Sequence, residues 1–318
     1  MRMVIIGGCG HYGFATEEVK KDPSLTVCAV AQGPHKEDMS GVIRACEGAG
    51  QQPKVYENYL DMLDTEKPEL AVVDPFFCDN ARVSIECLKR GIHVFSEKPL
   101  ATKIGELDEL ESVYRASGCA LQGMFNLRCC GWFNTVKKAV DEGKIGVVRT
   151  VQGRKSYKLG KRSETYLKME TFGGILPWVG IHAIDWVLTI GGKCLAAYGL
   201  QDAGYNNGNG ECETASAAIF RLENGVIGSV TADFYRPDGA PRHDDDRLLV
   251  TGTEGFIEAL NGKVYIEDSG PRRELELVEG KNCLRVMLDA IGTDEADRLA
   301  RAAFDSTRAA IEARDSLQ

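Results

Sequence analysis

The chain has 318 residues, which is beyond the size at which one hydrophobic core usually keeps growing, so two domains are expected. Its 43% of hydrophobic and 27% of charged residues are those of an ordinary globular protein. The formal net charge of −9 disfavours nucleic acid or a membrane surface as the main partner, and a small molecule is the better expectation.

The 11 cysteines are scattered along the chain without a C-x-x-C pair. This pattern predicts reduced thiols rather than a disulfide framework or a zinc site. The first apolar run, Met3–Ile6, is too short for a signal peptide or a membrane span. We therefore expect a cytoplasmic protein.

The same run, Met3–Ile6, predicts a short strand, and Phe14–Lys21 can continue as a helix after a glycine-rich turn. Gly8, Gly10 and Gly13 match G-x-G-x-x-G, which is typical of a dinucleotide site when it joins a strand to a helix. The first glycine is expected to make the tight turn, the second to let the backbone approach a pyrophosphate, and the third to let helix and strand pack closely. The N–H groups at the helix start then face the phosphates.

A second strand is predicted over Leu25–Ala31, and its end is where a site that prefers NAD places Asp or Glu against the ribose 2′-hydroxyl. Gln32 and Gly33 follow that strand, and the next carboxylates are Glu37 and Asp38. Without an acid at the strand end NADP is tolerated, because nearby polar and basic side chains can accept a 2′-phosphate. These side chains are Gln32, His35 and Lys36. The alternative is that Gln32 hydrogen-bonds either ribose and the site is indifferent.

Strands and helices then alternate. Leu70–Val73 reads as a strand that ends at Asp74 and Pro75. The elements predicted after it are a helix over Ala81–Arg90, a strand over Ile92–Phe95, a helix over Glu106–Ser117 and a strand over Ala120–Phe125. Short connections between alternating elements predict right-handed crossovers and a parallel sheet. The boundary is placed so that residues 1–122 form the dinucleotide-binding domain and residues 123–318 the second domain.

The strand over Ile92–Phe95 runs into a charged pair, Glu97 and Lys98, followed by Pro99. Buried strands usually end in Gly, Asn or Asp turns, so this ending is unusual. In open parallel sheets, ligands bind just outside the carboxyl ends of the strands. We therefore expect Lys98 to point at whatever the sheet binds, the alternative being a solvated strand end.

The second half begins with a helix over Trp132–Asp141 and then changes to strand-like runs. These runs are Val147–Gly153, Ala215–Leu222, Val226–Tyr235, Arg247–Thr251, Lys263–Ile266 and Glu274–Val278. Turns at Glu223–Gly225 and Asn261–Gly262 predict hairpins, and Asn282–Gln318 reads as mostly helical. The expected second domain is α+β on a largely antiparallel open sheet. Such a sheet usually pairs with a second copy, so a homodimer or homotetramer is expected.

One helix of the second half, expected to begin near Pro177, carries His182 and Asp185 three residues apart on one face. The opposite side carries Ile181, Ile184 and Leu188. The helix is therefore expected to bury one side and to present His182 and Asp185 on the other. A His with an Asp one turn on, behind a glycine-rich approach, indicates a functional site.

Three motifs together resemble the Gfo/Idh/MocA family of oxidoreductases, the group of glucose-fructose oxidoreductase and inositol dehydrogenase. They are Gly8–Gly13, Glu97-Lys98-Pro99 and Gly180-Ile181-His182-Ala183-Ile184-Asp185, and their order covers nearly the whole chain. The resemblance implies a Rossmann domain that carries NAD or NADP, and hydride transfer to or from a hydroxyl or ketone of a sugar, sugar acid or cyclitol. It implies that His182 takes the hydroxyl proton while Lys98 hydrogen-bonds the same oxygen. The Lys98–Pro99 bond is often cis in this family.

The candidate residues follow from these motifs. The catalytic candidates are Lys98 and His182. The cofactor-binding candidates are Gly8, Gly10, His11, Tyr12, Gly13, Gln32, Pro75, Glu97 and Lys98. The substrate-binding candidates are Asn126, Tyr157, Lys158, Arg162, Trp178 and Asp185.

Trp178 departs from the family pattern, because many members have Asp four residues before the His. Asp185 can supply the missing negative charge from a different direction. Either the substrate stacks on Trp178, as sugars commonly do on indole, or catalysis is weakened. The alternative is that Trp178 only packs.

Residues 149–168 carry seven cations against one acid, Glu164. By the family layout this segment follows the first strand of the sheet domain and can lie over the site. It suggests an anionic substrate, such as a uronate, a sugar phosphate or a sugar nucleotide, the alternative being a solvated loop. The acidic run at 242–246 is read as a polar turn, and no metal is expected.

Two other functions stay open. One is a glycosidase that uses bound NAD transiently, through oxidation and elimination. The other is a non-catalytic regulator that kept the nucleotide site, which the presence of Trp178 permits but the pairing of Lys98 with His182 opposes.

Overall fold

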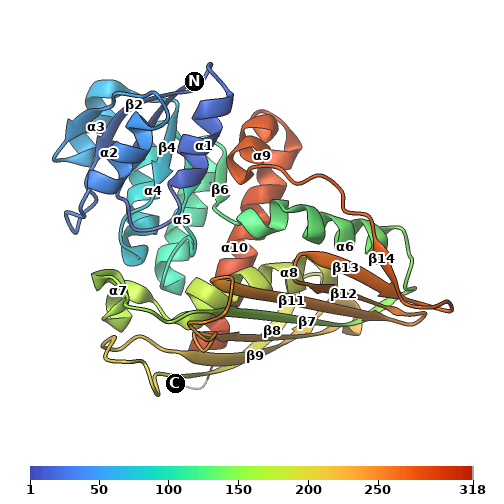
Figure 1. Cartoon of the computed structure of the whole chain (residues 1–318). Helices are drawn as coiled ribbons and strands as arrows, with labels where there is room; N and C mark the ends of the chain where they lie inside the picture. Colours follow the sequence, from blue (N-terminus) through green and yellow to red (C-terminus); the bar gives the residue numbers. More distant parts are fainter. Residues whose placement is uncertain (317–318) are drawn as a thin grey trace. The chain divides into compact units, whose positions relative to one another are not determined.

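The protein is described from a computed structural model, in which residues 1–316 are placed well enough to describe (Figure 1). Contacts within the chain divide it into two compact units. The first comprises Met1–Met124 and Asn282–Phe304, and the second comprises Phe125–Lys281 and the residues from Asp305 onward. Each unit is described by itself.

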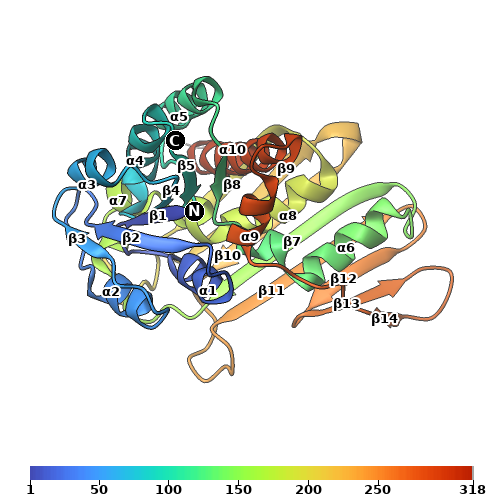
Figure 2. The ribbon, with the colours of Figure 1, turned by 90° about the horizontal axis from the view of Figure 1, so that it is seen from above.

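The first unit is a six-stranded parallel sheet in the order β3-β2-β1-β4-β5-β6. Its strands are β1 (Arg2–Ile6), β2 (Thr26–Ala31), β3 (Lys54–Tyr56), β4 (Leu70–Val73), β5 (His93–Ser96) and β6 (Leu121–Gly123). Its helices are α1 (Gly13–Lys21), α2 (Ser40–Glu47), α3 (Tyr59–Glu66), α4 (Asn80–Lys89), α5 (Ile104–Ser117), α9 (Cys283–Ala290) and the first part of α10 (Asp294–Asp315). Figure 2 shows α1 and α2 on one face of the sheet and α3, α4 and α5 on the other.

The central strands of this sheet are covered on both faces, which explains their uninterrupted apolar sequences. Met3–Ile6 and Leu70–Val73 are fully buried. The strand order reverses between β1 and β4, so the carboxyl ends of these strands open the crevice in which such sheets bind ligands. The predicted parallel sheet is confirmed.

Helix α9 belongs to the first unit, although the sequence placed all of 123–318 in the second domain. The side-chain amide of Asn282 donates to the carbonyl of Phe14 at 3.0 Å, and Arg285 Nε donates to Glu18 Oε1 at 2.7 Å. Both partners lie on α1. These contacts join residues far apart in sequence, so the run of elements along the chain did not reveal them.

The second unit is built on an eight-stranded sheet in the order β14-β13-β12-β11-β7-β10-β9-β8, in which only the β7–β10 pair is parallel. Its strands are β7 (Val148–Tyr157), β8 (Cys194–Asp202), β9 (Ala215–Leu222), β10 (Ile227–Asp233), β11 (Asp244–Gly252), β12 (Phe256–Leu260), β13 (Lys263–Glu267) and β14 (Arg273–Leu275). Its α-helices are α6 (Gly131–Asp141), α7 (Met169–Phe172), α8 (Ile181–Gly191) and the end of α10. The predicted largely antiparallel sheet is confirmed.

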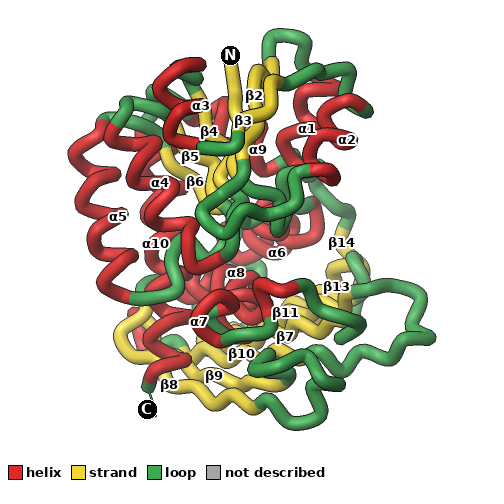
Figure 3. Tube along the Cα trace, turned by 90° about the vertical axis from the view of Figure 1, so that its left-hand side faces the viewer, coloured by secondary structure: helices red, strands yellow, loops and turns green. Residues whose placement is uncertain are grey.

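One face of this sheet is covered. Helix α8 packs on β7 and β10, and α6 packs on β12 and β13 (Figure 3). The approach of α8 depends on Gly153, since a Cβ there would lie 2.9 Å from the Cβ of Ala183. Strand residues therefore alternate between this covered face and an open face that leaves Tyr198, Leu200 and Ile219 more than half exposed.

The predicted hairpin turns are confirmed by left-handed backbone conformations. Asn224 and Gly225 have φ of 57° and 73°, and Asn261 and Gly262 have φ of 55° and 77°. Both pairs connect neighbouring antiparallel strands, as the twist of a hairpin requires.

Residues 242–246 were predicted to form a polar turn, and the structure corrects this for the three aspartates of the segment, since only Arg242 and His243 lie in bends before the strand. Asp244, Asp245 and Asp246 are the first residues of β11. Three neighbouring carboxylates are tolerated in a strand because cations meet them on both faces, Lys155 at Asp246 and Arg247 at Asp245.

Residues 169–191 include one stretch long and apolar enough to cross a membrane. Within the unit, 83% of its most apolar window is buried, as in the core helix of a folded domain. The helix does not simply begin at Pro177: a single π-helical turn over Leu176–Gly180 leads into α8.

Candidate functional site

The glycine loop of the first unit turns at Gly7, whose φ is 79°. A Cβ at Gly7 would lie 2.4 Å from the backbone of Pro75, and a Cβ at Gly10 would lie 1.9 Å from Glu97 Oε2. The sequence assigned the tight turn to Gly8 and the packing of helix on strand to Gly13. Both roles were wrong: Gly7 makes the turn, and a Cβ at Gly13 would meet no atom within 4 Å.

Two buried carboxylates hold this loop from behind. Asp74, at the end of β4, accepts the N–H of Tyr12 at 3.0 Å. Glu97, at the end of β5, accepts both the N–H and the ring Nδ1 of His11, at 2.8 and 2.6 Å. The carboxyl ends of two strands therefore fix the glycine loop at the end of the third.

The protonation of these two acids differs. Burial and the charge of Glu97 raise the pKa of Asp74 well above its usual value. Burial works against the charge of Glu97, but His11 and Lys98 lower the pKa of that carboxyl below its usual value. The two shifts have opposite directions, so the buried pair favours the proton on Asp74 and the negative charge on Glu97.

Lys98 follows directly, and its side chain is 1% exposed. Its N–H donates to Glu97 Oε1 at 2.8 Å, and the Lys98–Pro99 bond is cis, as the family resemblance implied. Asn80, the first residue of α4, donates to the carbonyls of Glu97 at 3.1 Å and Pro99 at 2.8 Å. This amide clamps both sides of the turn that carries Lys98.

A groove of about 650 Å³ lies at the ends of β2 and β3. Gln32, Lys36 and Tyr56 are among the residues that line it. The amide of Gln32 donates to the carbonyl of Glu37 at 3.2 Å, so Gln32 is partly committed to its own loop.

In the second unit, His182 lies near the start of α8 and is 2% exposed. The ring of Phe125 meets it edge-on, with centroids 6.3 Å apart, and the guanidinium of Arg128 lies 5.1 Å from the centre of the same Phe125 ring. The sequence expected His182 on an open face of the helix. It is instead buried, because the segment 125–129 packs against α8.

Asp185 is also buried and is fully engaged. Arg128 donates to both of its oxygens, and Ser306 Oγ donates to Oδ1 at 2.8 Å. Burial opposes the charge of Arg128, yet the Asp185 carboxylate raises the Arg128 pKa above its usual value. Any contribution of Asp185 to substrate binding therefore acts through Arg128, a residue that the sequence did not single out.

Trp178 is 5% exposed, and the ring of Tyr166 meets it edge-on at 5.8 Å between centroids. Within the second unit this arrangement favours the packing alternative for Trp178 over stacking of a sugar.

Four of the seven cations of residues 149–168 have contacts of two kinds. Lys155 pairs with Asp246 on the covered face, and Arg154 lies near Asp233 and Asp245 on the open face, so acids neutralise both. Lys158 donates instead to the carbonyls of Asp238 and Ala240.

Arg162 behaves like Lys158, because neutral groups surround it. It donates to the carbonyl of Lys158 at 2.6 Å, and its guanidinium lies 4.1 Å from the ring centre of Phe234 and 5.4 Å from that of Tyr166. Burial lowers its pKa, and its Nε is buried without a hydrogen-bond partner among the described residues. Tyr157, within residues 149–168, stacks on His243 with 4.8 Å between the ring centroids. Asn126 is half-buried at the start of the segment that carries Arg128.

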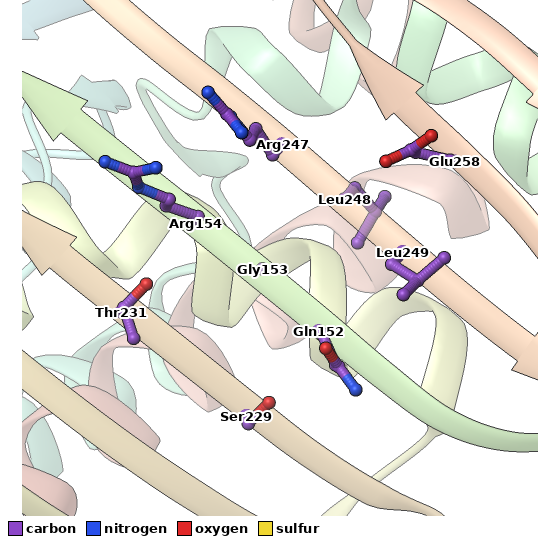
Figure 4. A pocket seen from close by; sticks show the side chains of 9 residues that line it. All are labelled: Gln152, Gly153, Arg154, Ser229, Thr231, Arg247, Leu248, Leu249 and Glu258. Atoms are coloured by element: carbon purple, nitrogen blue, oxygen red, sulfur yellow. The ribbon is translucent and has the colours of Figure 1, made fainter.

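A shallow groove on the open face of the sheet is separate from these residues (Figure 4). Arg154 and Arg247 project from neighbouring strands at one end of it, and Gln152, Ser229 and Glu258 line the rest. Because α8 covers the opposite face, this groove does not include His182.

Two family models match the chain. One is described as an oxidoreductase family with an NAD-binding Rossmann fold and matches residues 1–125. The other is described as a GFO/IDH/MocA C-terminal domain and matches residues 133–258. The chain belongs to the Gfo/Idh/MocA family of oxidoreductases. The predicted family, fold class and enzyme class are confirmed.

Individual relatives agree with this family. A solved structure of a candidate oxidoreductase from Thermotoga maritima is 38% identical, with a TM-score of 0.93 over 99% of this chain and 97% of that one. The myo-inositol 2-dehydrogenase of Thermotoga maritima is 25% identical over 227 residues, 69% of this chain and 66% of the relative. Glycosyl hydrolase family 109 protein 2 of Akkermansia muciniphila is 32% identical over 292 residues, 80% of this chain and 60% of the relative.

The first unit of this Gfo/Idh/MocA protein is thus an NAD-binding Rossmann domain, and its loop fits the cofactor's pyrophosphate. The space over Gly13 leaves the first turn of α1 open to approach by an anion. The raised pKa of Asp74 disfavours a second negative charge behind the loop. Gly8, Gly10, His11, Tyr12 and Gly13 would hold the phosphates, and the cofactor would supply the hydride chemistry.

One group of side chains has the geometry of metal ligands among residues 1–316: His35, Cys78 and Asp79. His35 Nδ1 lies 2.6 Å from Asp79 Oδ2, and Arg82 donates to the other oxygen at 2.7 Å. Since a guanidinium already neutralises this carboxylate, we interpret the group as a structural contact.

Two residues of the site escaped the sequence reasoning, Asn80 and Arg128, and a third, Glu37, was noted but not placed at the end of β2. Asn80 and Arg128 act through contacts with distant residues. A buried polar residue at the start of α4 was the available signal for Asn80, and an arginine just after the last Rossmann strand was the signal for Arg128.

Proposed function

We propose that this oxidoreductase transfers hydride between a nicotinamide cofactor and a hydroxyl or ketone of a sugar, sugar acid or cyclitol. In the oxidation direction, the hydroxyl proton passes to a ring nitrogen of His182 as the carbonyl forms. The ammonium of Lys98 hydrogen-bonds the same oxygen and stabilises its developing negative charge. A nicotinamide cofactor, when bound, would supply the hydride acceptor for the carbon that bears this oxygen.

The observation that carries this proposal is how firmly Lys98 is held. Glu97 accepts the Lys98 N–H, and the Asn80 amide donates to the carbonyls on both sides of Lys98. Holding a group in one geometry lowers the entropic cost of reaction, which a residue used only for binding does not require to this degree. The myo-inositol dehydrogenase relative supports a polyhydroxylated substrate.

A panel of neutral sugars, uronates and cyclitols, each offered with NAD and with NADP, tests this function. The absorbance of the reduced nicotinamide reports oxidation, and the corresponding ketones with NADH test the reverse reaction. We expect turnover with at least one member of the panel and its loss in Lys98→Met. Turnover that survives in Lys98→Met would remove Lys98 from the reaction.

We also propose that the substrate carries an anionic group. Lys158 and Arg162 are held by carbonyls and aromatic rings rather than by acids, so their positive charges are not cancelled locally. The buried Nε of Arg162 has a donor to spare. In the panel, uronates should then be turned over with a lower KM than the matching neutral sugars.

A second function is the glycosidase that oxidises its substrate transiently, and the Akkermansia relative favours it. In this case the abstracted hydride returns to the sugar after elimination, so no reduced cofactor accumulates. Release of nitrophenol from aryl glycosides, dependent on NAD but without net NADH, would support it. Accumulation of NADH in step with product would exclude it.

We further propose a cellular compartment and an oligomeric state for the protein. All 11 cysteines are free thiols, which fits a reducing compartment such as the cytoplasm. The open face of the sheet leaves Tyr198, Leu200, Ile219 and Ile227 between 56% and 65% exposed, and we propose that a second copy covers them. Light scattering should give a dimer or tetramer, and Ile219→Glu should shift the population toward smaller species.

A further inference from the structure

The loop after β2 brings an acid back to the end of that strand. Gly33 to Lys36 form a tight turn, in which the Lys36 N–H donates to the carbonyl of Gly33 at 3.1 Å and Lys36 has a left-handed φ of 56°. Glu37 comes next, and it lies beside Gly33 again although it is four residues further along the chain.

The carboxylate of Glu37 is bound between the ends of two strands. Its Oε2 accepts the N–H of Gly33 at 2.6 Å, just past β2, and its Oε1 accepts the N–H of Phe76 at 3.0 Å, just past β4. The residue is 7% exposed. A Cβ at Gly33 would lie 2.7 Å from Glu37 Oε1, so Gly33 makes room for the acid.

A second contact holds the same loop in place. The ring of His35 stacks on Phe76 with 4.4 Å between centroids, and His35 Nδ1 lies 2.6 Å from Asp79 Oδ2. His35 and Glu37 therefore both tie the loop after β2 to the segment after β4. The Glu37 carboxylate is therefore held in one position by contacts with the segments after β2 and β4.

This position is the one from which a dinucleotide site of this type reads the adenosine ribose. In a Rossmann fold that prefers NAD, an acid at the end of the second strand accepts a hydrogen bond from the ribose 2′-hydroxyl. The sequence suggested that NADP is tolerated because no acid directly follows β2. In space, Glu37 supplies a carboxylate at that strand end, reached through a turn rather than through the strand itself.

We propose that Glu37 is the residue that makes this enzyme prefer NAD over NADP. Each carboxylate oxygen accepts one backbone N–H and has a further lone pair for the 2′-hydroxyl. A 2′-phosphate would meet this negative charge, and it would find the N–H groups of Gly33 and Phe76 already taken. Lys36 is exposed and lines the groove at the ends of β2 and β3.

The inference rests on cofactor binding by the first unit and not on the substrate or reaction proposed above. Its test therefore measures binding alone. Dissociation constants for NADH and NADPH are obtained from nicotinamide fluorescence with the wild-type protein, Glu37→Gln and Glu37→Ala. The matched control is Asp38→Asn. Asp38 is an exposed acid next to Glu37, and its own carboxylate accepts the N–H and the hydroxyl of Ser40.

The wild type is expected to bind NADH about tenfold or more tightly than NADPH, because like charges brought together disfavour binding. Glu37→Gln and Glu37→Ala should reduce this ratio by about tenfold, and Asp38→Asn should leave it within about twofold. An equal or better affinity of the wild type for NADPH overturns the proposal, as does an unchanged ratio in both Glu37 variants. A protein that binds NADH selectively but transfers no hydride would refute the proposed reaction and leave this inference intact.

If both variants fail to fold, competition by 5′-AMP and by 2′-phospho-5′-AMP for NADH bound to the wild type keeps the proposal falsifiable. The compound that carries the 2′-phosphate should compete about tenfold less well. Equal or better competition by the phosphorylated compound overturns the proposal.

Discussion

The strand ends of the first unit gather buried carboxylates, whereas the candidate substrate residues of the second unit gather cations. Asp74, Glu97 and Glu37 each accept backbone N–H groups of the loops around the dinucleotide site. In the second unit, Arg128 and Lys155 pair with buried acids, but Lys158 and Arg162 are held by carbonyls and rings.

The difference lies in what the charges are used for. In the first unit, the carboxylates accept backbone N–H groups and so fix the loops. In the second unit, Lys158 and Arg162 contact carbonyls and aromatic rings, and we propose that their charge meets an anionic substrate. A cofactor with an obligatory structure requires a fixed cradle, while an anionic substrate requires net charge of the opposite sign.

The largest effect should come from the two residues assigned to the reaction, one from each unit. Lys98→Met and His182→Asn should lower kcat by about 10²- to 10⁴-fold, because each removes a positioned group that handles the reacting oxygen or its proton. NADH affinity should change little in His182→Asn. Lys103→Met, an exposed lysine five residues after Lys98, is the control and should keep its kcat. A wild-type kcat in His182→Asn would leave the second unit without its proposed base.

The buried ion pair of the second unit should give the next largest effect, on stability. Arg128→Met leaves the Asp185 carboxylate buried without its cation, which should lower the free energy of unfolding by about 3–5 kcal/mol. Urea denaturation followed by circular dichroism measures it. The exposed pair of Arg115 and Glu111 is the control, and Arg115→Met should cost no more than about 1 kcal/mol. Equal losses in both variants would mean that Arg128 is not structurally special.

The uncompensated cations should give a smaller effect, confined to binding. Arg162→Met and Lys158→Met should raise KM for an anionic substrate by about tenfold and change kcat little, since they act on a charge remote from the reacting carbon. KM for the neutral counterpart should stay constant. Lys168→Met, a cation at the end of the same segment, is the control. An equal rise in KM for acidic and neutral substrates would point to a general loss of structure.

Much of the fold followed from local patterns. The apolar runs at β1 and β4 identified strands buried on both faces, and the Asn-Gly turns located two hairpins, because these signals reside in adjacent residues. Two strands of the second sheet were missed, β8 at its edge and β12 inside it, because each contains residues that strands disfavour, such as Ala and Gly in β8 and Glu and Ala in β12. Helix α9 was assigned to the second unit, because its partner α1 lies far away in the sequence: Arg285 and Glu18, which join them, are 267 residues apart.

The same holds for the candidate site. Motifs with fixed spacing singled out Lys98 and His182 as candidates, but the residues that contact their surroundings came from elsewhere in the chain. Asn80 holds the turn of Lys98 through hydrogen bonds to two carbonyls, and Arg128 engages Asp185 beside His182. Glu37 was seen and set aside, since its place along the chain did not reveal the turn that returns it to β2.

The smallest effect is expected for Asp22, a carboxylate outside the cofactor and substrate residues. It tests an ion pair near the surface rather than a buried one. Hydrogen bonds from Ser24 and from Arg285 lower the pKa of Asp22 from 3.8 to about 2. A carboxyl whose pKa is lowered in the folded state adds stability above its unfolded pKa, and that stability is lost as the pH falls from about 4 to about 2. Asp22→Asn should therefore weaken the protein slightly at neutral pH and remove this part of the acid dependence. Melting temperatures measured between pH 4 and pH 2 test this, with Asp61→Asn, an exposed acid on α3, as the control. If Asp22→Asn keeps the pH profile of the wild type, the charge of Asp22 does not stabilise the contact that Arg285 of α9 makes with it.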